Sequence, residues 1–285
     1  MTGAYGTSPS YLDWLPTAAA ADTADAEPVA AADPAQEVVV EDGPTAAAPI
    51  IVVAGAHGGS GTSVVAMLLA MVSDDTVVVL DGTPVGGDIS RRTPAPVAQS
   101  VAVWSVWLTG GRALPTSTGW TVLGRDRRDD ASPSHLAAAV TAARAAVGGH
   151  GLVVVDAGAC IGSTWFDAAA DLADHIVVTI DDRPGAANAA RPVLTELHRR
   201  LGIAGMGRSV QLVVTSQRPG VDHVTGPLAD ALTGRVAGVV HLPYDAELAA
   251  GVGIDPSQLS AAALAAAVAV LSGSRAHLHR EAHRP

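Results

Sequence analysis

Short, near-continuous runs of Val, Ile and Leu alternate along this chain with longer Ala-rich stretches, and this alternation most constrains the fold. A strand made almost only of apolar residues has to be covered on both faces, which is typical of a parallel sheet inside an α/β domain. Strands are expected at residues 50–54, 76–80, 120–123, 152–155, 175–180, 210–215 and 236–241.

The stretches between these runs have the composition of helices. Helices are expected at residues 62–72, 99–108, 134–146, 164–172, 186–201, 227–232 and 260–271. Because strands alternate with helices, the crossovers should be right-handed, and the sequence predicts an α/β fold with a doubly wound, mostly parallel sheet and helices on both faces. Ligands bind such sheets beyond the carboxyl ends of the strands, so the loops that follow the strands are the candidate sites.

Composition divides the chain into three expected parts. Residues 1–48 contain eight acidic residues and no basic one, with few large apolar side chains, and predict a disordered acidic arm. This arm either solvates the domain or carries a docking motif around Trp14. Residues 49–272 form the expected α/β domain, and residues 273–285 a polar tail of Arg and His.

Charge and residue usage exclude several classes of protein. The 285 residues carry a formal net charge of −11, and all 17 basic residues are arginine, so mechanisms that need a lysine ammonium are excluded. An acidic body disfavours nonspecific DNA binding. A single cysteine, Cys160, excludes an intramolecular disulfide. No apolar run is long enough to span a bilayer and no secretory start is visible, so we expect a cytoplasmic protein.

A glycine-rich turn follows the first expected strand and precedes the first expected helix. Glycines allow the backbone to aim several N–H groups inward, and the helix N-terminus adds partial positive charge. This context predicts a loop that binds the phosphates of a nucleotide. The candidate nucleotide-binding residues are His57, Gly58, Gly59, Ser60, Gly61, Thr62 and Ser63.

The turn resembles the deviant Walker A motif, Lys-Gly-Gly-x-Gly-Lys-Thr/Ser, of the ParA/MinD family of P-loop ATPases. His57 and Thr62 stand where the family has its two lysines. The other defined positions match, at Gly58, Gly59, Gly61 and Ser63. The resemblance implies a P-loop fold that binds ATP and Mg²⁺, with the Ser63 hydroxyl as one metal ligand.

Two further segments resemble the family's switch regions. Residues 76–90 are similar to its second strand and first switch, with Asp81 in place but Thr83 where a second aspartate is usual. Residues 152–159 resemble its Walker B strand and second switch, with Asp156 as the metal-side carboxylate. The resemblance therefore implies a magnesium site made by Ser63, Asp81 and Asp156.

The later part of the chain resembles the family less evenly. Residues 236–251 are similar to its late strand and Pro-Tyr/Phe-Asp loop, and the Gly86-Gly87-Asp88 turn is closest in style to the CpaE/TadZ and septum-site-determining branch. The strand at 210–215 ends in Thr-Ser-Gln where the family commonly has Asn-Arg. Selectivity for adenine is therefore left open.

The departures from the motif bear on catalysis. Losing one well-placed donor or charge typically slows an enzyme by about 10²–10³, and here two lysines and one aspartate are replaced together. The sequence therefore predicts a degenerate member, a pseudo-ATPase that hydrolyses its nucleotide poorly or not at all. The alternative is an arginine that completes the site, with Arg91, Arg92 and Arg183 as candidates.

Three functions remain open at this point. The favoured hypothesis is a positioning or scaffold protein that recruits a secretion, pilus or conjugation machine. The alternatives are an active ATPase in chromosome or plasmid partition or in cell-division positioning, and a partition protein that binds DNA nonspecifically, which the acidic body disfavours. The resemblance also implies a homodimer through the face of the phosphate loop, a protein partner in a larger assembly, and recruitment to the membrane or a cell pole by that partner.

Overall fold

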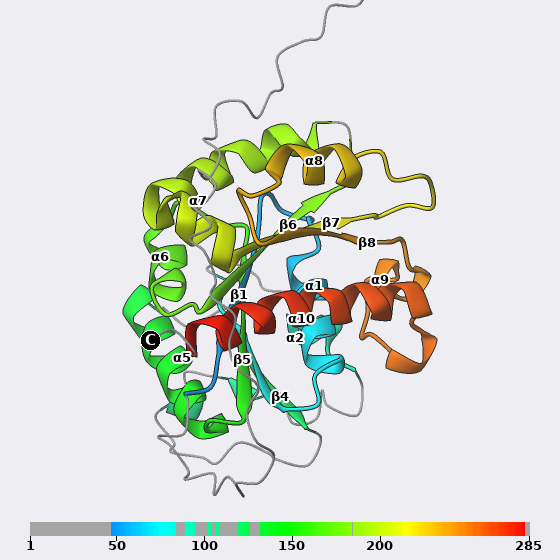
Figure 1. The fold of residues 1–285 in the computed structure, drawn as a ribbon. Helices are drawn as coiled ribbons and strands as arrows, with labels where there is room; N and C mark the ends of the chain where they lie inside the picture. Colours follow the sequence, from blue (N-terminus) through cyan, green and yellow to red (C-terminus); the bar gives the residue numbers. More distant parts are fainter. Residues whose placement is uncertain are drawn as a thin grey trace, which may run out of the picture.

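The computed structural model describes residues 47–83, 89–94, 102–103, 106–108, 119–125, 132–183 and 185–282. Within these residues the strands form one eight-stranded sheet in the order β3-β4-β2-β5-β1-β6-β7-β8, and every pair of neighbours is parallel. Helices cover both faces of this sheet (Figure 1). The expected doubly wound α/β architecture is therefore confirmed.

All seven expected strands are present, with ends that shift slightly. They are β1 (Ile50–Gly55), β2 (Thr76–Asp81), β4 (Trp120–Gly124), β5 (Gly151–Gly158), β6 (His175–Asp181), β7 (Val210–Thr215) and β8 (Gly238–Leu242). A further strand, β3 (Ala102–Val103), falls inside the helix that we expected at 99–108, so that prediction is wrong there. These two residues pair with the outer edge of β4, and a β-branched residue favours that pairing over a helix.

The helices are α1 (Thr62–Met71), α2 (Ile89–Arg92), α5 (Pro133–Val147), α6 (Thr164–Ala170), α7 (Ala186–Ser209), α8 (Thr225–Leu232), α9 (Ala246–Ala249) and α10 (Ala261–Ala282), with a 3-10 turn at Pro256–Gln258. Residues 106–108, from the expected helix at 99–108, are helical. Two of the helices are longer than the sequence suggested. In α7, two helical segments join at Gly202, whose φ of 65° is not helical. Helix α10 continues past residue 271, and Arg275 anchors it to Ser73 and Asp75 in the turn before β2.

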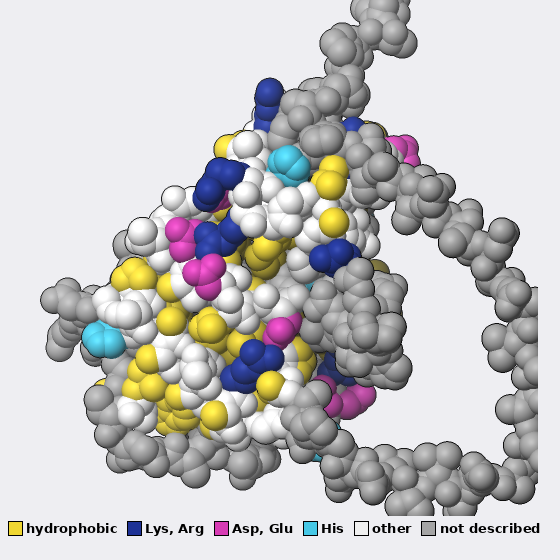
Figure 2. Space-filling model, turned by 60° about the vertical axis from the view of Figure 1, so that its left-hand side comes forward, with side chains coloured by type: hydrophobic (Ala, Val, Ile, Leu, Met, Phe, Trp, Pro, Cys, Tyr) yellow, Lys and Arg dark blue, Asp and Glu magenta, His cyan; other side chains and the backbone are white. Residues whose placement is uncertain are grey.

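The face of the molecule that carries α6 and α7 has charges of both signs. Arg200 on α7 pairs with Asp167 and Asp171 of α6 and its flank, and Arg199 pairs with Glu196. Figure 2, in which the left-hand side of Figure 1 comes forward, shows arginine and acidic side chains next to one another there. These pairs neutralise the arginines locally, so the face is mixed in charge.

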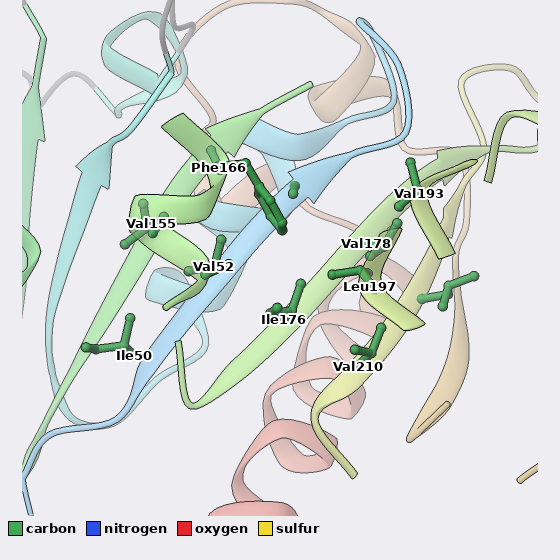
Figure 3. Close-up of a cluster of buried hydrophobic side chains, with 14 of the residues drawn as sticks. Ile50, Val52, Val155, Phe166, Ile176, Val178, Val193, Leu197 and Val210 are labelled. Atoms are coloured by element: carbon green, nitrogen blue, oxygen red, sulfur yellow. The ribbon is translucent and has the colours of Figure 1, made fainter. Parts of the chain in front are cut away.

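The central strands supply side chains to two apolar layers, because alternate residues of a strand point to opposite faces. Ile50 and Val52 of β1 lie in the layer under α5, α6, α7 and α8, whereas Ile51 and Val53 lie under α1 and α10. Figure 3 shows part of the first layer, which includes the fully buried Phe166. Burying each such side chain contributes roughly 1.5–3 kcal/mol, and this double coverage holds the strand ends in fixed positions.

Candidate functional site

The glycine-rich turn folds back on itself between β1 and α1. Gly59 and Gly61 have φ values of 81° and 86°, in the region that favours glycine, and the Ser60 amide donates to the His57 carbonyl at 3.3 Å. No side chain caps the start of α1, where Gly61 is the N-cap residue. The first N–H groups of the helix therefore point out of the turn, as an anion-binding loop requires.

A pocket of about 680 Å³ opens above this turn. Its walls come from loops that follow β1, β2, β5, β7 and β8, together with Arg92 of α2. The lining residues include His57, Thr62, Ser63, Thr83, Arg92, Ser216, Gln217, Leu242, Pro243 and Asp245. The carboxyl ends of the parallel strands thus meet at one cavity, as their common direction predicts.

Six of the seven candidate nucleotide-binding residues line this pocket, and Ser60 does not. The Ser60 side chain is fully buried, and its Oγ lies 2.9 Å from Oγ1 of Thr179 on β6. Thr62 Oγ1 also lies 3.0 Å from Thr179 Oγ1. These three hydroxyls form a buried cluster beneath the loop, so Ser60 braces the turn from below and does not face the pocket.

The three candidate metal ligands lie at neighbouring strand ends. Ser63 Oγ donates to Asp156 Oδ2 at 2.5 Å, and Asp81 pairs in register with Asp156 across β2 and β5. Both carboxylates are buried. Burial raises the pKa of Asp81, and hydrogen bonds from the Thr83 hydroxyl and amide act against that rise.

This donor set fits a hard divalent cation. A hydroxyl and carboxylate oxygens are the ligands that Mg²⁺ accepts, usually alongside water and phosphate oxygens. Within the described residues no group of three or more His, Cys, Asp or Glu side chains is arranged to hold a metal. A cation here would therefore depend on ligand oxygens as well as on Ser63, Asp81 and Asp156.

Comparison with solved structures gives the same picture of the fold. A ParA family ATPase from Chlorobium tepidum is 14% identical with a TM-score of 0.60, covering 78% of this chain and 98% of that one. The MinD of Pyrococcus horikoshii, solved with Mg-ADP, is 14% identical with a TM-score of 0.56, covering 79% and 94%. In the MinC:MinD complex of Aquifex aeolicus the matched chain is 16% identical with a TM-score of 0.55, covering 81% and 96%.

The chain has a ParA/MinD-like P-loop fold. No protein-family model matches its sequence, and no curated protein matches it either. The likeness therefore resides in the arrangement of strands, helices and loops, and the sequence has diverged within it.

His57, which the sequence resemblance aligns with the first motif lysine, follows β1 at the start of the turn. Its Nε2 lies 3.5 Å from Oδ2 of Asp181, whose side chain is 2% exposed, and its Nδ1 lies 3.0 Å from the Gly58 carbonyl. Arg183 pairs with the same carboxylate. Asp181 thus holds Arg183, one of the candidate replacement cations, at the loop's flank, and Arg183 does not line the pocket.

Arg92 is the candidate arginine that does line the pocket. It ends α2, and its guanidinium donates to the Leu248 carbonyl of α9 at 2.9 Å. Arg91, its neighbour on the same short helix, is exposed and does not line the pocket. The fold therefore brings one arginine to the cavity wall across from the phosphate loop.

Sequence reasoning missed two residues that hold the end of β2. The Trp165 indole N–H donates to the Gly82 carbonyl, and Arg125 donates to the Thr83 carbonyl. The Arg125 guanidinium also stacks over the Trp165 ring, 4.8 Å from its centroid. Arg125 directly follows β4, so the rule that sites gather beyond strand ends was a usable signal for it, whereas no local pattern marks Trp165.

The wall formed by the loop after β7 is tied to the phosphate loop. Thr215 Oγ1 donates to the Ser60 carbonyl at 3.0 Å, and the Gln217 side-chain amide donates to the Gly59 carbonyl. A Cβ on Gly61 would lie 3.0 Å from the Thr215 methyl group. These contacts bind the two loops closely together.

Cys160 lies just after β5 and is a free cysteine. Burial raises the pKa of Cys160 to about 11, so its sulfur stays protonated at neutral pH. Among the described residues, no helix combines the length and apolar character that crossing a bilayer needs.

Proposed function

We propose that this chain binds a nucleoside triphosphate with Mg²⁺ at its phosphate loop, hydrolyses it poorly or not at all, and acts as a positioning or scaffold protein. The observation that carries the proposal is the combination of an intact anion-binding turn with a pocket and a hydroxyl–carboxylate pair, in a chain that contains no lysine. The ParA/MinD-like fold supports it, because the Pyrococcus horikoshii MinD was solved with Mg-ADP.

Phosphate binding is supported by the backbone. A Cβ placed on Gly58 or Gly59 would meet no atom within 4 Å, so space remains open over this part of the turn. The uncapped N-terminus of α1 adds partial positive charge directed at that space. Backbone groups alone can therefore hold the phosphates.

Magnesium would be held by the Ser63 hydroxyl, with Asp156 and Asp81 accepting its coordinated waters or binding it directly. Bound there, it would neutralise part of the phosphate charge. In the present structure Ser63 is hydrogen-bonded to Asp156, and Thr83 to Asp81. Both carboxylates thus have internal partners that keep the site ordered without a cation.

Poor hydrolysis follows from the charges that surround the terminal phosphate. Phosphoryl transfer is catalysed by positioning and by positive charge, and a missing donor typically costs about 10²–10³ in rate. Thr62 replaces the phosphate lysine and directs its hydroxyl at Thr179. Thr83 replaces a carboxylate and hydrogen-bonds to Asp81, so neither position supplies catalytic charge.

The test is a pair of measurements on the full chain. Calorimetry with Mg-ATP should give saturable binding, while phosphate release should stay below about 1 per minute, far under the roughly 10 per second of a typical enzyme. A faster turnover that disappears in both Ser63→Ala and Asp156→Ala would contradict the proposal. Absence of binding would contradict its nucleotide part.

Arg92 favours a second candidate function, an ATPase completed by arginine. Its place in the pocket wall would let a guanidinium, which binds phosphate oxygens in a bidentate manner, act on a bound triphosphate. Arg92→Ala with Arg91→Ala as matched control separates the two candidates. A turnover lost only in Arg92→Ala would favour the active ATPase, and a rate equally low in all three proteins would favour the scaffold.

The scaffold role is a proposal about partners. The Aquifex aeolicus MinD was solved in a complex with MinC, which supports a protein partner for a chain of this fold. A homodimer through the phosphate-loop face and recruitment of a secretion, pilus or conjugation machine belong to the same proposal. Sedimentation with and without Mg-ATP tests the dimer, and a DNA shift assay across salt concentrations tests the disfavoured partition role.

A further inference from the structure

The pocket wall after β7 contains a relay of three side chains that the proposed function does not use. Ser216 Oγ lies 2.9 Å from Nε2 of His241 on β8, and His241 Nδ1 lies 3.8 Å from Asp222 Oδ2. Ser216 lines the pocket. We propose that this relay makes the Ser216 hydroxyl a hydrogen-bond acceptor toward the pocket, so that Ser216 selects nucleotides whose base carries an amino group. The inference rests on the proposed function and deepens it.

Asp222 is fixed in position and charge. Its Oδ1 accepts the backbone N–H groups of Val224 at 2.8 Å and Thr225 at 3.1 Å, which leaves Oδ2 on the side of His241. Burial acts to raise the pKa of Asp222, but hydrogen bonds from Thr225 and Val224 outweigh it and keep the pKa below its usual value. A carboxylate therefore faces the imidazole at neutral pH.

That negative charge selects the tautomer of His241. A carboxylate beside Nδ1 favours the proton on Nδ1, so Nε2 has a lone pair and accepts a hydrogen bond. The Ser216 hydroxyl must then donate its single proton to Nε2. Only oxygen lone pairs of Ser216 remain for a ligand, and these accept from an N–H group.

The neighbouring polar side chains are engaged elsewhere. Thr215 donates its hydroxyl to a backbone carbonyl, and Gln217 donates its amide to the phosphate loop. Asp245 uses Oδ1 to accept the Glu247 and Leu248 amides and Oδ2 to accept the Ser260 amide. Ser216 is thus the side chain of this wall whose own proton is committed to the histidine, and its backbone N–H is fixed on the Leu242 carbonyl at 2.9 Å.

The sheet order puts Ser216 on the side of the phosphate loop opposite the metal-binding carboxylates, where a base attached to the bound phosphates has room to lie. The carboxylates Asp81 and Asp156 lie on the β5 and β2 side of β1, whereas β6, β7 and β8 follow on its other side. With strands about 4.8 Å apart, the end of β7 lies roughly 10 Å from the end of β1. The apolar Leu242 and Pro243 line the same wall and suit a flat base.

The experiment compares ATP with purine riboside triphosphate, which lacks only the amino group, and with inorganic tripolyphosphate, which lacks the base. Calorimetry at about pH 8 with Mg²⁺ should give ATP roughly tenfold tighter binding than purine riboside triphosphate, since one hydrogen bond to a defined acceptor is gained. Ser216→Ala should reduce this ratio to about one.

Asp222→Asn is the sharper variant. Asparagine keeps an oxygen that accepts the hydrogen bonds from the Val224 and Thr225 amides. Its side-chain amide, however, donates to His241 Nδ1 and so moves the imidazole proton to Nε2. The Ser216 hydroxyl then turns its proton toward the pocket and opposes an amino group. The ATP preference should fall to about one or below it.

Ser134→Ala, at an exposed serine on α5, is the matched control and should keep the wild-type ratio. A wild-type ratio within about twofold of one, or a preference that survives in both Ser216→Ala and Asp222→Asn, overturns the inference. If tripolyphosphate binds in that case, the proposed triphosphate site stands without base selection. If none of the three ligands binds, the proposed function fails together with the inference.

Discussion

Ser63 at the start of α1 donates a 2.5 Å hydrogen bond to Asp156 at the end of β5. The contact joins the phosphate loop to the neighbouring strand and places a hydroxyl beside a buried carboxylate. A cation that enters this site has to share Asp156 with Ser63. The pair is thus the point at which metal binding and the geometry of the loop are coupled.

Removing the charge of Asp156 should weaken metal-dependent binding. Asp156→Asn keeps the shape of the side chain, and loss of one carboxylate is expected to lower affinity for Mg-ATP by about 10-fold or more. Binding of ATP measured in EDTA should change little, because the backbone of the loop is untouched. Asp230→Asn, at an exposed position on α8, is the control. Equal loss with and without metal would refute a metal role.

Restoring a lysine should strengthen phosphate binding. Position 62 lines the pocket, so the longer side chain of Thr62→Lys has space to extend toward a triphosphate. An ammonium there should raise ATP affinity by roughly 10-fold through a charge-assisted hydrogen bond. Thr62→Val, which removes the hydroxyl contacts with Thr179 and Ser60, should not raise affinity and should cost about 1 kcal/mol in urea unfolding. Unchanged affinity in the lysine variant would mean that the phosphates bind elsewhere.

Trp165→Phe should destabilise the domain. The substitution keeps an apolar ring but leaves the Gly82 carbonyl without the indole N–H and weakens the stacking of Arg125. We expect a loss of about 1–2 kcal/mol in the free energy of unfolding, measured by urea denaturation. A double-mutant cycle with Arg125→Met isolates the stacking contribution. Additive effects of the two substitutions would exclude coupling between the two side chains.

Asp245 should make stability depend on acid pH. Burial acts to raise its pKa, but hydrogen bonds from Ser260, Leu248 and Glu247 outweigh it, and the folded pKa lies below the unfolded value of 3.8. The stabilisation is therefore complete above the unfolded value and is lost as the pH falls from there through the lower folded pKa. Asp245→Asn should lower Tm at neutral pH and flatten the acid limb of Tm against pH. A parallel shift at every pH would rule out this linkage.

Local patterns predicted most of the fold because strands covered on both faces have a distinctive composition. Residues 102–103 show the limit of such patterns. They fall within the stretch 99–108, for which we expected a helix, yet Ala102 and Val103 pair with the outer edge of β4. An available sheet edge is a property of the tertiary structure, and it overrides the local preference. Trp104, inside the same expected helix, lies outside the described residues.

The candidate site was predictable where its residues are adjacent in sequence and much less so where the sheet assembles them. The turn at 57–63 was found as a unit, but its motif does not reveal that Ser60 points down to Thr179. Asp181, Arg125 and His241 come from separate strands or strand ends, and only the order of the strands brings them to the pocket region. The contacts that each of these residues makes could be predicted only with knowledge of which strands are neighbours.

The anchoring of α10 by Arg275 to Asp75 has a practical consequence. Asp75 precedes β2, so this contact lies at the amino edge of the sheet, and β1 also starts at that edge, where the Ile50 amide donates to Asp174. The polypeptide chain therefore enters and leaves the folded core at the amino edge of the sheet, on the side away from the cavity. A fusion partner or surface linkage joined at residue 47 or at residue 282 would therefore sit at the amino edge of the sheet, opposite the pocket, during immobilised binding assays.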